Sequence, residues 1–249
     1  MKRSLLSIVA VLSIVAFAVP AGAAGEENAG KNAAVALYRE GRIEEAVAAF
    51  EKLRTEKPGD DDLKTWHSLA RLEKARLMKE AGAKDYKDVV EHAWAVLKPI
   101  RGRNADNPTW YLAVAKALWL NDRSWKAQKS IEKALYYQPD YPEGRLLLGD
   151  IALEAGRNAA PPPLTATPGA DTRRSAASDA RRAYAAVLES KVATPELRAE
   201  AHYKMGLTAM ELEGDRKAAA GCWQEAVKAG PGSRCGKLAA EKLAKDAGR

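Results

Sequence analysis

The stretch from Tyr38 to Pro58 constrains the fold of this 249-residue chain more than any other. Gly41 separates two helical patterns, and the second places the small Ala46 one turn before the large Phe50. A small and a large residue at i and i+4 lie on one face of a helix and let two antiparallel helices interlock closely. Such a pair cannot bury all of its apolar surface alone. The stretch therefore predicts similar pairs stacked beside it.

Helical patterns that end in proline recur along the chain, at Pro58, Pro99 and Pro139. Aromatic residues make up only 6% of the chain and alanine is abundant, which favours closely packed helices over sheet. The recurrence predicts five units followed by a polar-faced capping helix over 233–248. The units are expected at about residues 27–60, 61–106, 107–140, 141–193 and 194–231.

Helix starts are marked in three of these units. Asp60 or Asp61, Asn107 and Thr194 stand where a side-chain oxygen caps the first turn, and the last two precede a proline at the first helical position. Residues 157–176 break the pattern because they are rich in Pro, Ala and Thr, and they predict a disordered loop. Helix is expected to return at Ser178. The loop is either a tolerated insertion or a segment that binds a partner.

The units resemble the tetratricopeptide repeat (TPR), a helix-turn-helix unit of about 34 residues. In the first unit the matching residues are Tyr38, Gly41, Ala46, Phe50 and Pro58. In the second unit, Val89 and Ala93 match the small and the large position of the return helix. The resemblance implies an all-α, right-handed α-solenoid of about five helix pairs, in which the first helix of each pair lines a concave groove.

The last repeat also resembles that of periplasmic envelope-assembly TPR proteins such as the Tol-Pal-associated coordinator. Gly206 and the run PGSRCGKLAAEKL over 231–243 carry this resemblance.

Residues 1–23 have the pattern of a secretory signal peptide. Lys2 and Arg3 precede the apolar run Leu5 to Val19, and small residues follow up to an expected cleavage after Ala23. The alternative is an uncleaved anchor, but the run is shorter than the ~20 residues that span a bilayer. We expect a periplasmic protein without a stable membrane anchor. The net charge of +7 could indicate nucleic acid, but export argues against nucleic acid as a partner.

The two cysteines, Cys222 and Cys235, would enter an oxidising compartment. Either the two cysteines form a disulfide, or Cys222 is buried and Cys235 is free. Their expected positions on antiparallel helices differ in height by roughly 10 Å, which exceeds the reach of a disulfide.

No pattern for catalysis, for a cofactor or for a metal site stands out. The chain has no glycine-rich phosphate loop, HExxH, CxxC or GxSxG. His67, His92 and His202 fall in different repeats without ligand spacing. Acidic pairs lie at the spacings of solvated helix faces. We therefore expect a protein that is not an enzyme and that carries no cofactor.

Residues predicted to face the groove grade from basic through aromatic to acidic along the chain. The candidates are Lys31, Tyr38, Arg39, Lys64, His67, Arg71, Lys74, Tyr111, Leu118, Trp119, Asp150, Glu154, Tyr203 and Met210. Either these charges are ordinary solvated faces, or they form a peptide groove with an aromatic middle. In the second case an acidic segment is expected to bind near the second unit.

The other aromatic residues are assigned by position on their helices. Trp66, Trp94 and Trp223 are expected in the core, whereas Trp125, Tyr136 and Tyr137 pack between repeats or line the convex side.

Together these features predict a non-catalytic protein-protein interaction scaffold of the bacterial cell envelope that binds a protein or peptide segment in its groove. The sequence leaves two alternative functions open. One is a structural subunit of a secretion, pilus or polysaccharide-export machine, and the other is an accessory to an enzyme that acts on cell-wall glycan.

Overall fold

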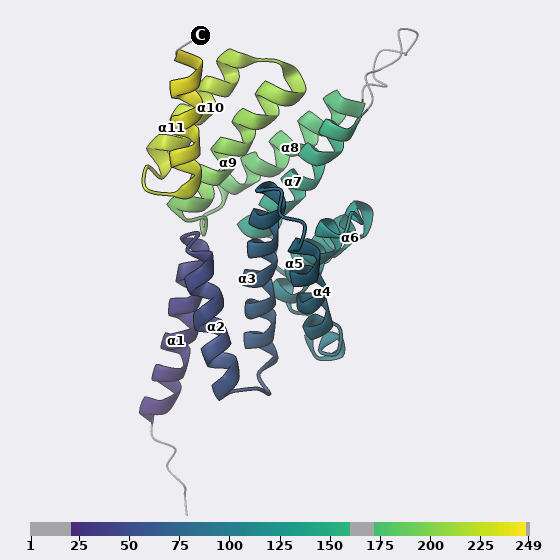
Figure 1. Cartoon of the computed structure of the whole chain (residues 1–249), viewed down its shortest axis with the longest axis vertical. Helices are drawn as coiled ribbons and strands as arrows, with labels where there is room; N and C mark the ends of the chain where they lie inside the picture. Colours follow the sequence, from purple (N-terminus) through teal and green to yellow (C-terminus); the bar gives the residue numbers. More distant parts are fainter. Residues whose placement is uncertain (1–20, 160–171, 248–249) are drawn as a thin grey trace, which may run out of the picture.

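The computed structural model describes residues 21–159 and 172–247, which form helices and turns without a strand (Figure 1). The helices are α1 (Ala21–Arg39), α2 (Ile43–Glu56), α3 (Asp61–Glu80), α4 (Tyr86–Leu97), α5 (Pro108–Leu120), α6 (Ser124–Tyr137), α7 (Pro142–Asn158), α8 (Thr172–Glu189), α9 (Pro195–Thr208), α10 (Arg216–Ala229) and α11 (Arg234–Ala247). Each odd-numbered helix up to α9 packs against the helix that follows it, and α11 covers the last pair. The predicted all-α solenoid with a capping helix is confirmed. The predicted signal peptide, 1–23, lies outside the described residues except for its last three, with which α1 begins.

The predicted helix caps are present. Asp60 accepts hydrogen bonds from the backbone N–H groups of the first turn of α3, at 2.8 and 3.0 Å. Asn107 does the same for α5, at 2.9 and 3.2 Å, and Thr194 for α9, at 3.4 Å. Pro108 and Pro195 occupy the first helical positions. Each cap is worth about 1 kcal/mol, so these residues fix where the helices begin.

Helices within a pair approach closely where a glycine faces a large ring. A Cβ atom on Gly149 would lie 2.3 Å from the ring of the buried Tyr184, and one on Gly206 would lie 2.3 Å from the indole of Trp223. Neither site has room for a side chain. The small-against-large pattern that predicted the helix pairs is therefore the packing that joins α7 to α8 and α9 to α10.

In α4 the predicted register is wrong by one turn. Val89 is only half-buried, whereas Val90, Ala93 and Leu97 are buried, with the spacing of the buried residues of α2. Ala93 thus takes the small position and Leu97 the large one. The sequence pattern misled because α4 has apolar residues at both sets of positions, and only contact with α3 distinguishes them.

The predicted loop over 157–176 is shorter than expected. Helix α7 continues to Asn158 and α8 begins at Thr172 rather than at Ser178. Two contacts explain the longer helices: Arg157 pairs with Glu211 at 2.6 Å, and Ala176 and Ala177 are buried. Residues 160–171, the centre of the predicted loop, lie outside the described residues.

Helix α9 does not end in an α-helical turn. It runs into a π-helical turn, η2 (Ala209–Glu213), that stops at Gly214, whose φ of 72° is left-handed. A π turn holds one more residue than an α turn and so accommodates an extra residue without breaking the helix. Glu211 and Glu213 of this turn pair with Arg157 and Arg181, which fasten η2 to α7 and α8.

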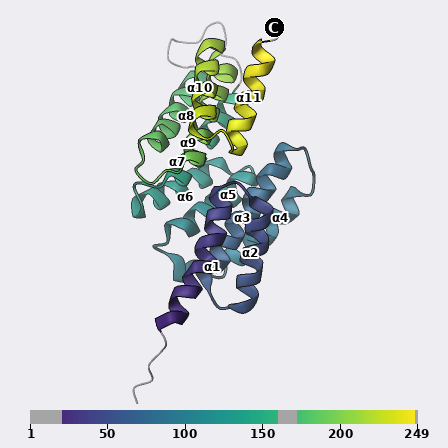
Figure 2. The ribbon, with the colours of Figure 1, turned by 90° about the vertical axis from the view of Figure 1, so that its left-hand side faces the viewer.

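The solenoid curves so that its last helix comes back towards its first units. Helices α7–α11 sit above α1–α6 in Figures 1 and 2, and α7 belongs to both groups. Its Leu147 packs in the core of α1–α6, and its Leu153 packs in the core that continues to α9. As a result Arg234, at the start of α11, lies 2.9 Å from Glu80 at the end of α3.

Candidate functional site: a charged concave groove

Two neighbouring cavities lie on the concave side, where α3, α5, α7, α9 and α11 face one another. They measure about 90 and 430 Å³ and share the lining residues Arg76, Asp150, Lys204, Arg234 and Cys235. We call these two cavities together the groove. Ligand pockets generally measure about 300–1,000 Å³, so the larger cavity has the size to take side chains of a partner.

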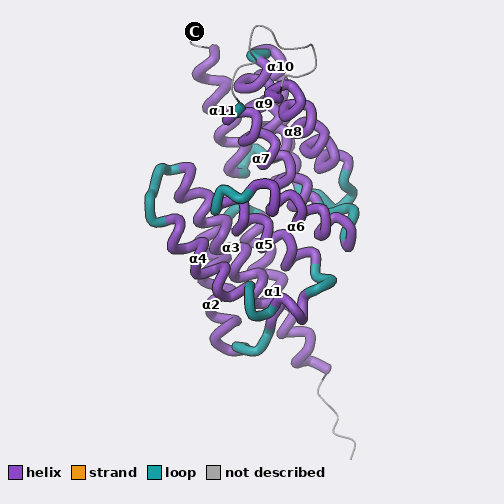
Figure 3. Tube along the Cα trace, turned by 90° about the vertical axis from the view of Figure 1, so that its right-hand side faces the viewer, coloured by secondary structure: helices purple, strands orange, loops and turns teal. Residues whose placement is uncertain are grey.

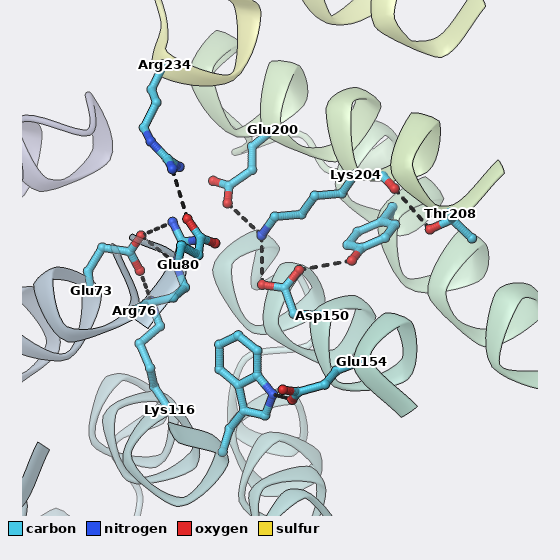
Figure 4. Close-up of polar contacts among 12 residues, drawn as sticks. Glu73, Arg76, Glu80, Lys116, Asp150, Glu154, Glu200, Lys204, Thr208 and Arg234 are labelled. Carbon is cyan, nitrogen blue, oxygen red and sulfur yellow. Dashed lines mark hydrogen bonds and ion pairs between the residues drawn. The ribbon is translucent and has the colours of Figure 1, made fainter. Parts of the chain in front are cut away.

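The first cluster of charges in the groove centres on Glu73 of α3 (Figure 4). Its carboxylate accepts from Arg76 on the same helix, at 2.8 Å, and from Lys116 of α5. The Lys116 ammonium also lies 3.4 Å from the Tyr38 hydroxyl. Burial by itself favours the protonated form of Glu73, but Arg76 and Lys116 outweigh burial and hold the pKa of its carboxyl well below its ordinary value. Glu73 is therefore a charged member of a buried ion cluster.

The second cluster centres on Lys204 of α9. Its ammonium lies 2.7 Å from Asp150 of α7 and 2.6 Å from Glu200 one turn earlier on α9. The Tyr184 hydroxyl donates to the other Asp150 oxygen at 2.9 Å. Burial acts to lower the pKa of Lys204, but Asp150 and Glu200 outweigh it and raise that pKa above its ordinary value. Lys204 thus stays charged and ties α7 to α9.

Further ion pairs cross the groove between helices that are distant in sequence. Arg234 donates to Glu80 at 2.9 Å, and Arg39 of α1 donates to Glu143 of α7 at 3.1 Å. The Trp119 indole N–H donates to Glu154, which connects α5 to α7. Charged residues on the first helix of every unit therefore pair with one another across the groove. They do not change from basic to acidic along the chain.

The larger cavity joins apolar surface to an excess of positive charge. Its lining includes Trp119, Leu153, Tyr203, Leu207 and Leu238. Six further lining residues are Lys or Arg and four are Asp or Glu. Two of these cations, Arg76 and Lys204, also pair with Glu73 and Glu200 outside the lining, which leaves Lys79 and Lys242 as cations that can turn to a ligand. An apolar wall beside such lysines suits an apolar side chain that has a carboxylate next to it.

Six of the predicted groove residues line the groove. Tyr38 and Arg39 border the smaller cavity, Trp119, Glu154 and Tyr203 border the larger, and Asp150 borders both. Of the predicted aromatic middle only Trp119 borders a cavity, together with the acidic Asp150 and Glu154.

The basic residues predicted on α3 lie on another side of that helix. His67 is buried, with its Nδ1 atom 2.6 Å from the Arg54 guanidinium of α2, and Lys64 pairs with Asp61 at 3.0 Å. Arg71 and Lys74 follow on the same side as His67, and neither borders a cavity. Residues five apart on a helix point roughly 140° away from each other, so Arg76 faces the groove and Arg71 does not. The cavities border α3 only between Glu73 and Glu80, so Lys64, His67 and Arg71 lie too early on the helix to reach them.

Four other candidates also lie away from both cavities. Lys31 pairs with Asp62 at 2.9 Å, Leu118 packs against the core of α1–α6, and Met210 packs beside Trp223. Tyr111 stacks on Tyr137 at the end of the α5–α6 hairpin, with ring centroids 5.9 Å apart.

Seven basic residues of the groove escaped prediction, and three of them are buried: Arg76, Lys116 and Lys204. A signal for two of them exists in the sequence. Lys116 is the one charged residue in PTWYLAVAKALWL, and Lys204 lies in the otherwise mostly uncharged run AHYKMGLTAM. A lone charge within a helix that is buried on most sides must have a buried partner.

Both cysteines are free, as in the second of the two alternatives, but Cys222 is half-buried rather than buried, and Cys235 is buried at the groove. Burial raises the pKa of the Cys235 thiol to about 12, so it stays protonated. Within 21–159 and 172–247, no three acidic, histidine or cysteine residues gather as metal ligands would. No helix there is long and apolar enough to cross a bilayer.

No known protein family matches the sequence, and no curated protein matches it. Solved structures do. TTC0263, a thermophilic TPR protein in Thermus thermophilus, is 17% identical with a TM-score of 0.59, over 87% of this chain and 98% of that one. The MamA protein is 15% identical with a TM-score of 0.45, over 82% and 92% of the two chains. The anaphase-promoting complex (APC/C) hetero-tetramer Cut9-Hcn1 is 13% identical with a TM-score of 0.42, over 81% and 38%. The first of these similarities shows that the chain has the fold of a TPR solenoid.

Proposed function

We propose that this chain is a non-catalytic interaction scaffold that binds a segment of another protein in its groove. The observation that carries the proposal is the 430 Å³ cavity, in which Trp119, Leu153 and Leu207 lie beside an excess of cations. Rigid aromatic and aliphatic side chains supply contact area at small entropic cost, and surrounding charges select and orient a ligand.

The charge of the cavity favours an acidic segment. Lys79 has its ammonium 3.5 Å from Glu154, and Lys242 lies 6.0 Å from the centroid of the Trp223 ring, at the edge of the cavity. Both side chains can turn towards a carboxylate that enters from solvent, because lysine stems are flexible. An apolar side chain of the same segment would then contact Trp119 or Leu207.

The pairing of the acidic residues supports a role without catalysis. Glu73, Asp150, Glu154 and Glu200 each contact a cation in the groove. A general base needs a carboxylate or imidazole whose basicity is available to a substrate. Carboxylates held in ion pairs between helices serve the fold and the shape of the groove instead.

The proposal is tested by selecting peptides from a random library displayed on phage against the purified chain and measuring the affinity of selected peptides by fluorescence anisotropy. We expect acidic peptides with apolar residues, and we expect K79A/K242A to weaken them about tenfold, with a loss of affinity in high salt. The control K237A/K245A removes the same charge from the exposed side of α11 and should leave affinity unchanged.

The same assay separates the groove from the basic side of α3. If R71A/K74A weakens the selected peptides and K79A/K242A does not, the binding site lies near the second unit and the groove assignment is wrong. If neither double variant changes the affinity of the selected peptides, acidic segments bind neither Lys79 and Lys242 nor Arg71 and Lys74.

We further propose that the chain acts in the bacterial cell envelope after export. The support is the pattern of residues 1–23, with its basic start, apolar run and small residues before Ala24. N-terminal sequencing of the protein from the periplasmic fraction should give Ala24 as the first residue. A protein that keeps Met1 and stays in the cytoplasm would refute export.

A further inference from the structure

The outer face of α6 carries exposed aromatic side chains. Among the described residues, the large hydrophobic side chains that stand exposed are Trp125, Tyr136 and Tyr137 on α6, and Val192 between α8 and α9. Trp125 is 68% exposed and Tyr136 is 80% exposed. Three of these four residues thus gather on one helix, which lies at the edge of the molecule in Figure 3.

The aromatic rings have a regular arrangement along α6. Trp125 and Tyr136 are eleven residues apart, which is close to three full turns, so they point the same way about 16 Å apart. Tyr136 meets Tyr137 edge to face at 5.3 Å, and Tyr137 stacks on Tyr111 of α5 at 5.9 Å. The Tyr136 ring is therefore held by its neighbours, while its outer side faces solvent.

The surface between these rings is cationic. Lys126 lies 5.5 Å from the centroid of the Trp125 ring, and Lys133 lies 5.6 Å from that of Tyr111. Lys129 lies between them and pairs with Glu132, the one acidic residue of α6, at 2.7 Å. Three lysines against one glutamate leave this face with a net positive charge.

The fold does not require this face to be aromatic. α6 buries Ala127, Ile131 and Ala134 against α5 on its other side, and those residues hold the helix in place. No residue of α6 borders the groove cavities. Exposed Trp and Tyr gathered on a charged helix are typical of an interaction surface rather than of packing.

We propose that the outer face of α6, from Trp125 to Tyr137, is a second docking surface, and that it binds an acidic helical segment of a partner protein. Apolar side chains about three turns apart on that segment would contact Trp125 and Tyr136. Carboxylates between them would meet Lys129 and Lys133. Net charge and aromatic spacing on α6 are complementary to that one kind of segment.

A bilayer surface fits less well. A helix that lies in a membrane interface inserts a continuous aliphatic and aromatic stripe. Between Trp125 and Tyr136 this face has Gln128, Lys129, Glu132 and Lys133 instead, which a protein partner can hydrogen-bond and a lipid tail cannot.

The test is a selection from a random displayed peptide library against the purified chain, with an excess of soluble W125S/Y136S protein to remove peptides that bind elsewhere. We expect acidic peptides with apolar residues at helical spacing. Their affinity, measured by fluorescence anisotropy, should fall at least about tenfold in W125S/Y136S and severalfold in K129A/K133A. Val192→Ser and K237A/K245A are matched controls that should retain full affinity, as should the groove variant K79A/K242A.

Several outcomes would overturn this proposal. One is a selection that yields no acidic peptides, and another is a set of peptides whose affinity depends on Lys79 and Lys242 instead. Vesicles of phosphatidylcholine and phosphatidylglycerol that bind wild type but not W125S/Y136S, without peptide binding, would make the face a lipid surface. A dimer in analytical ultracentrifugation that W125S/Y136S abolishes would show that a second copy covers it.

Discussion

The groove and the outer face of α6 are both rich in aromatic and charged side chains, but they use them differently. In the groove, Lys116 and Lys204 are buried and pair with carboxylates of other helices. On α6, Lys129 pairs within its own helix and Trp125 is exposed. Charge in the groove therefore holds the solenoid in its curve, whereas charge and aromatic surface on α6 contribute little to the fold.

Because of this difference, substitutions in the groove and substitutions on α6 should affect different properties of the protein. A substitution of Lys116 or Lys204, the buried lysines of the groove, removes the partner of a buried carboxylate cluster and should reduce stability. A substitution on α6 removes groups that water already solvates and should leave stability unchanged. Substitutions in the two regions should therefore differ in how much they change the free energy of unfolding.

Replacing Lys204 by Met should give the largest loss. The change leaves Asp150 and Glu200, whose side chains are 11% and 25% exposed, without their shared buried cation. Breaking a largely buried ion cluster in this way destabilises a protein by about 3 kcal/mol. Urea denaturation followed by circular dichroism measures the change in the free energy of unfolding.

The matched control is Lys228→Met on the exposed side of α10, where Lys228 pairs only with Glu225 one turn away. We expect a change below about 0.5 kcal/mol there. Equal effects of the two substitutions would mean that the groove charges contribute no more than surface pairs, and the contrast between the two regions would fail.

His67 should make stability depend on pH, although it faces away from the groove. Burial, with Arg54 and Arg71 nearby, lowers the pKa of His67 to about 4, and the Arg54 guanidinium donates to its Nδ1 atom. The unfolded histidine has a pKa near 6.5, so between about pH 6.5 and 4 the unfolded chain binds more protons than the folded chain. Stability is complete above this window and falls by about 2–3 kcal/mol as the pH decreases through it.

Denaturation midpoints measured across this range check the prediction. His67→Gln keeps an acceptor for Arg54 but does not titrate, so most of the slope should disappear. His92→Gln on the exposed side of α4 is the control and should keep the wild-type slope. A slope that survives in His67→Gln would assign the pH dependence to other groups.

The solenoid could be predicted from the sequence because the signals for its helix pairs are local. Asn107 and Thr194 mark helix starts, and Gly206 opposite Trp223 marks a close contact between neighbouring helices. Each of these signals acts within one unit, where the spacing of residues along the chain determines which side chains meet. In α4 the local pattern allowed two registers, and contact with α3 selected the one that was not predicted.

The groove was harder to predict because it depends on how units are placed relative to one another. Glu80 and Arg234 meet across 154 residues, and no motif spacing contains that contact. Each unit adds a small rotation, so the curvature that brings α11 to α3 accumulates over the array. On α3 the cavities lie beside the last turns of the helix, which is why Arg76 borders the groove and Arg71 does not.

The Glu80–Arg234 pair is expected to have a smaller effect on stability. Both side chains are more than 40% exposed, and such pairs contribute about 0.5 kcal/mol or less. A double-mutant cycle with Glu80→Ala and Arg234→Ala measures the coupling. A coupling energy above about 2 kcal/mol would show that the closure of the solenoid depends on this one pair rather than on the buried clusters.

Replacing Trp125 and Tyr136 by Ser should change stability least of all, by less than about 0.5 kcal/mol. The buried side of α6 keeps Ala127, Ile131 and Ala134, so its packing on α5 is untouched. If urea denaturation instead shows a loss comparable to that of Lys204→Met, the aromatic face is part of the fold. A folded variant with unchanged stability that no longer binds acidic peptides would show that α6 carries its aromatic residues for a partner.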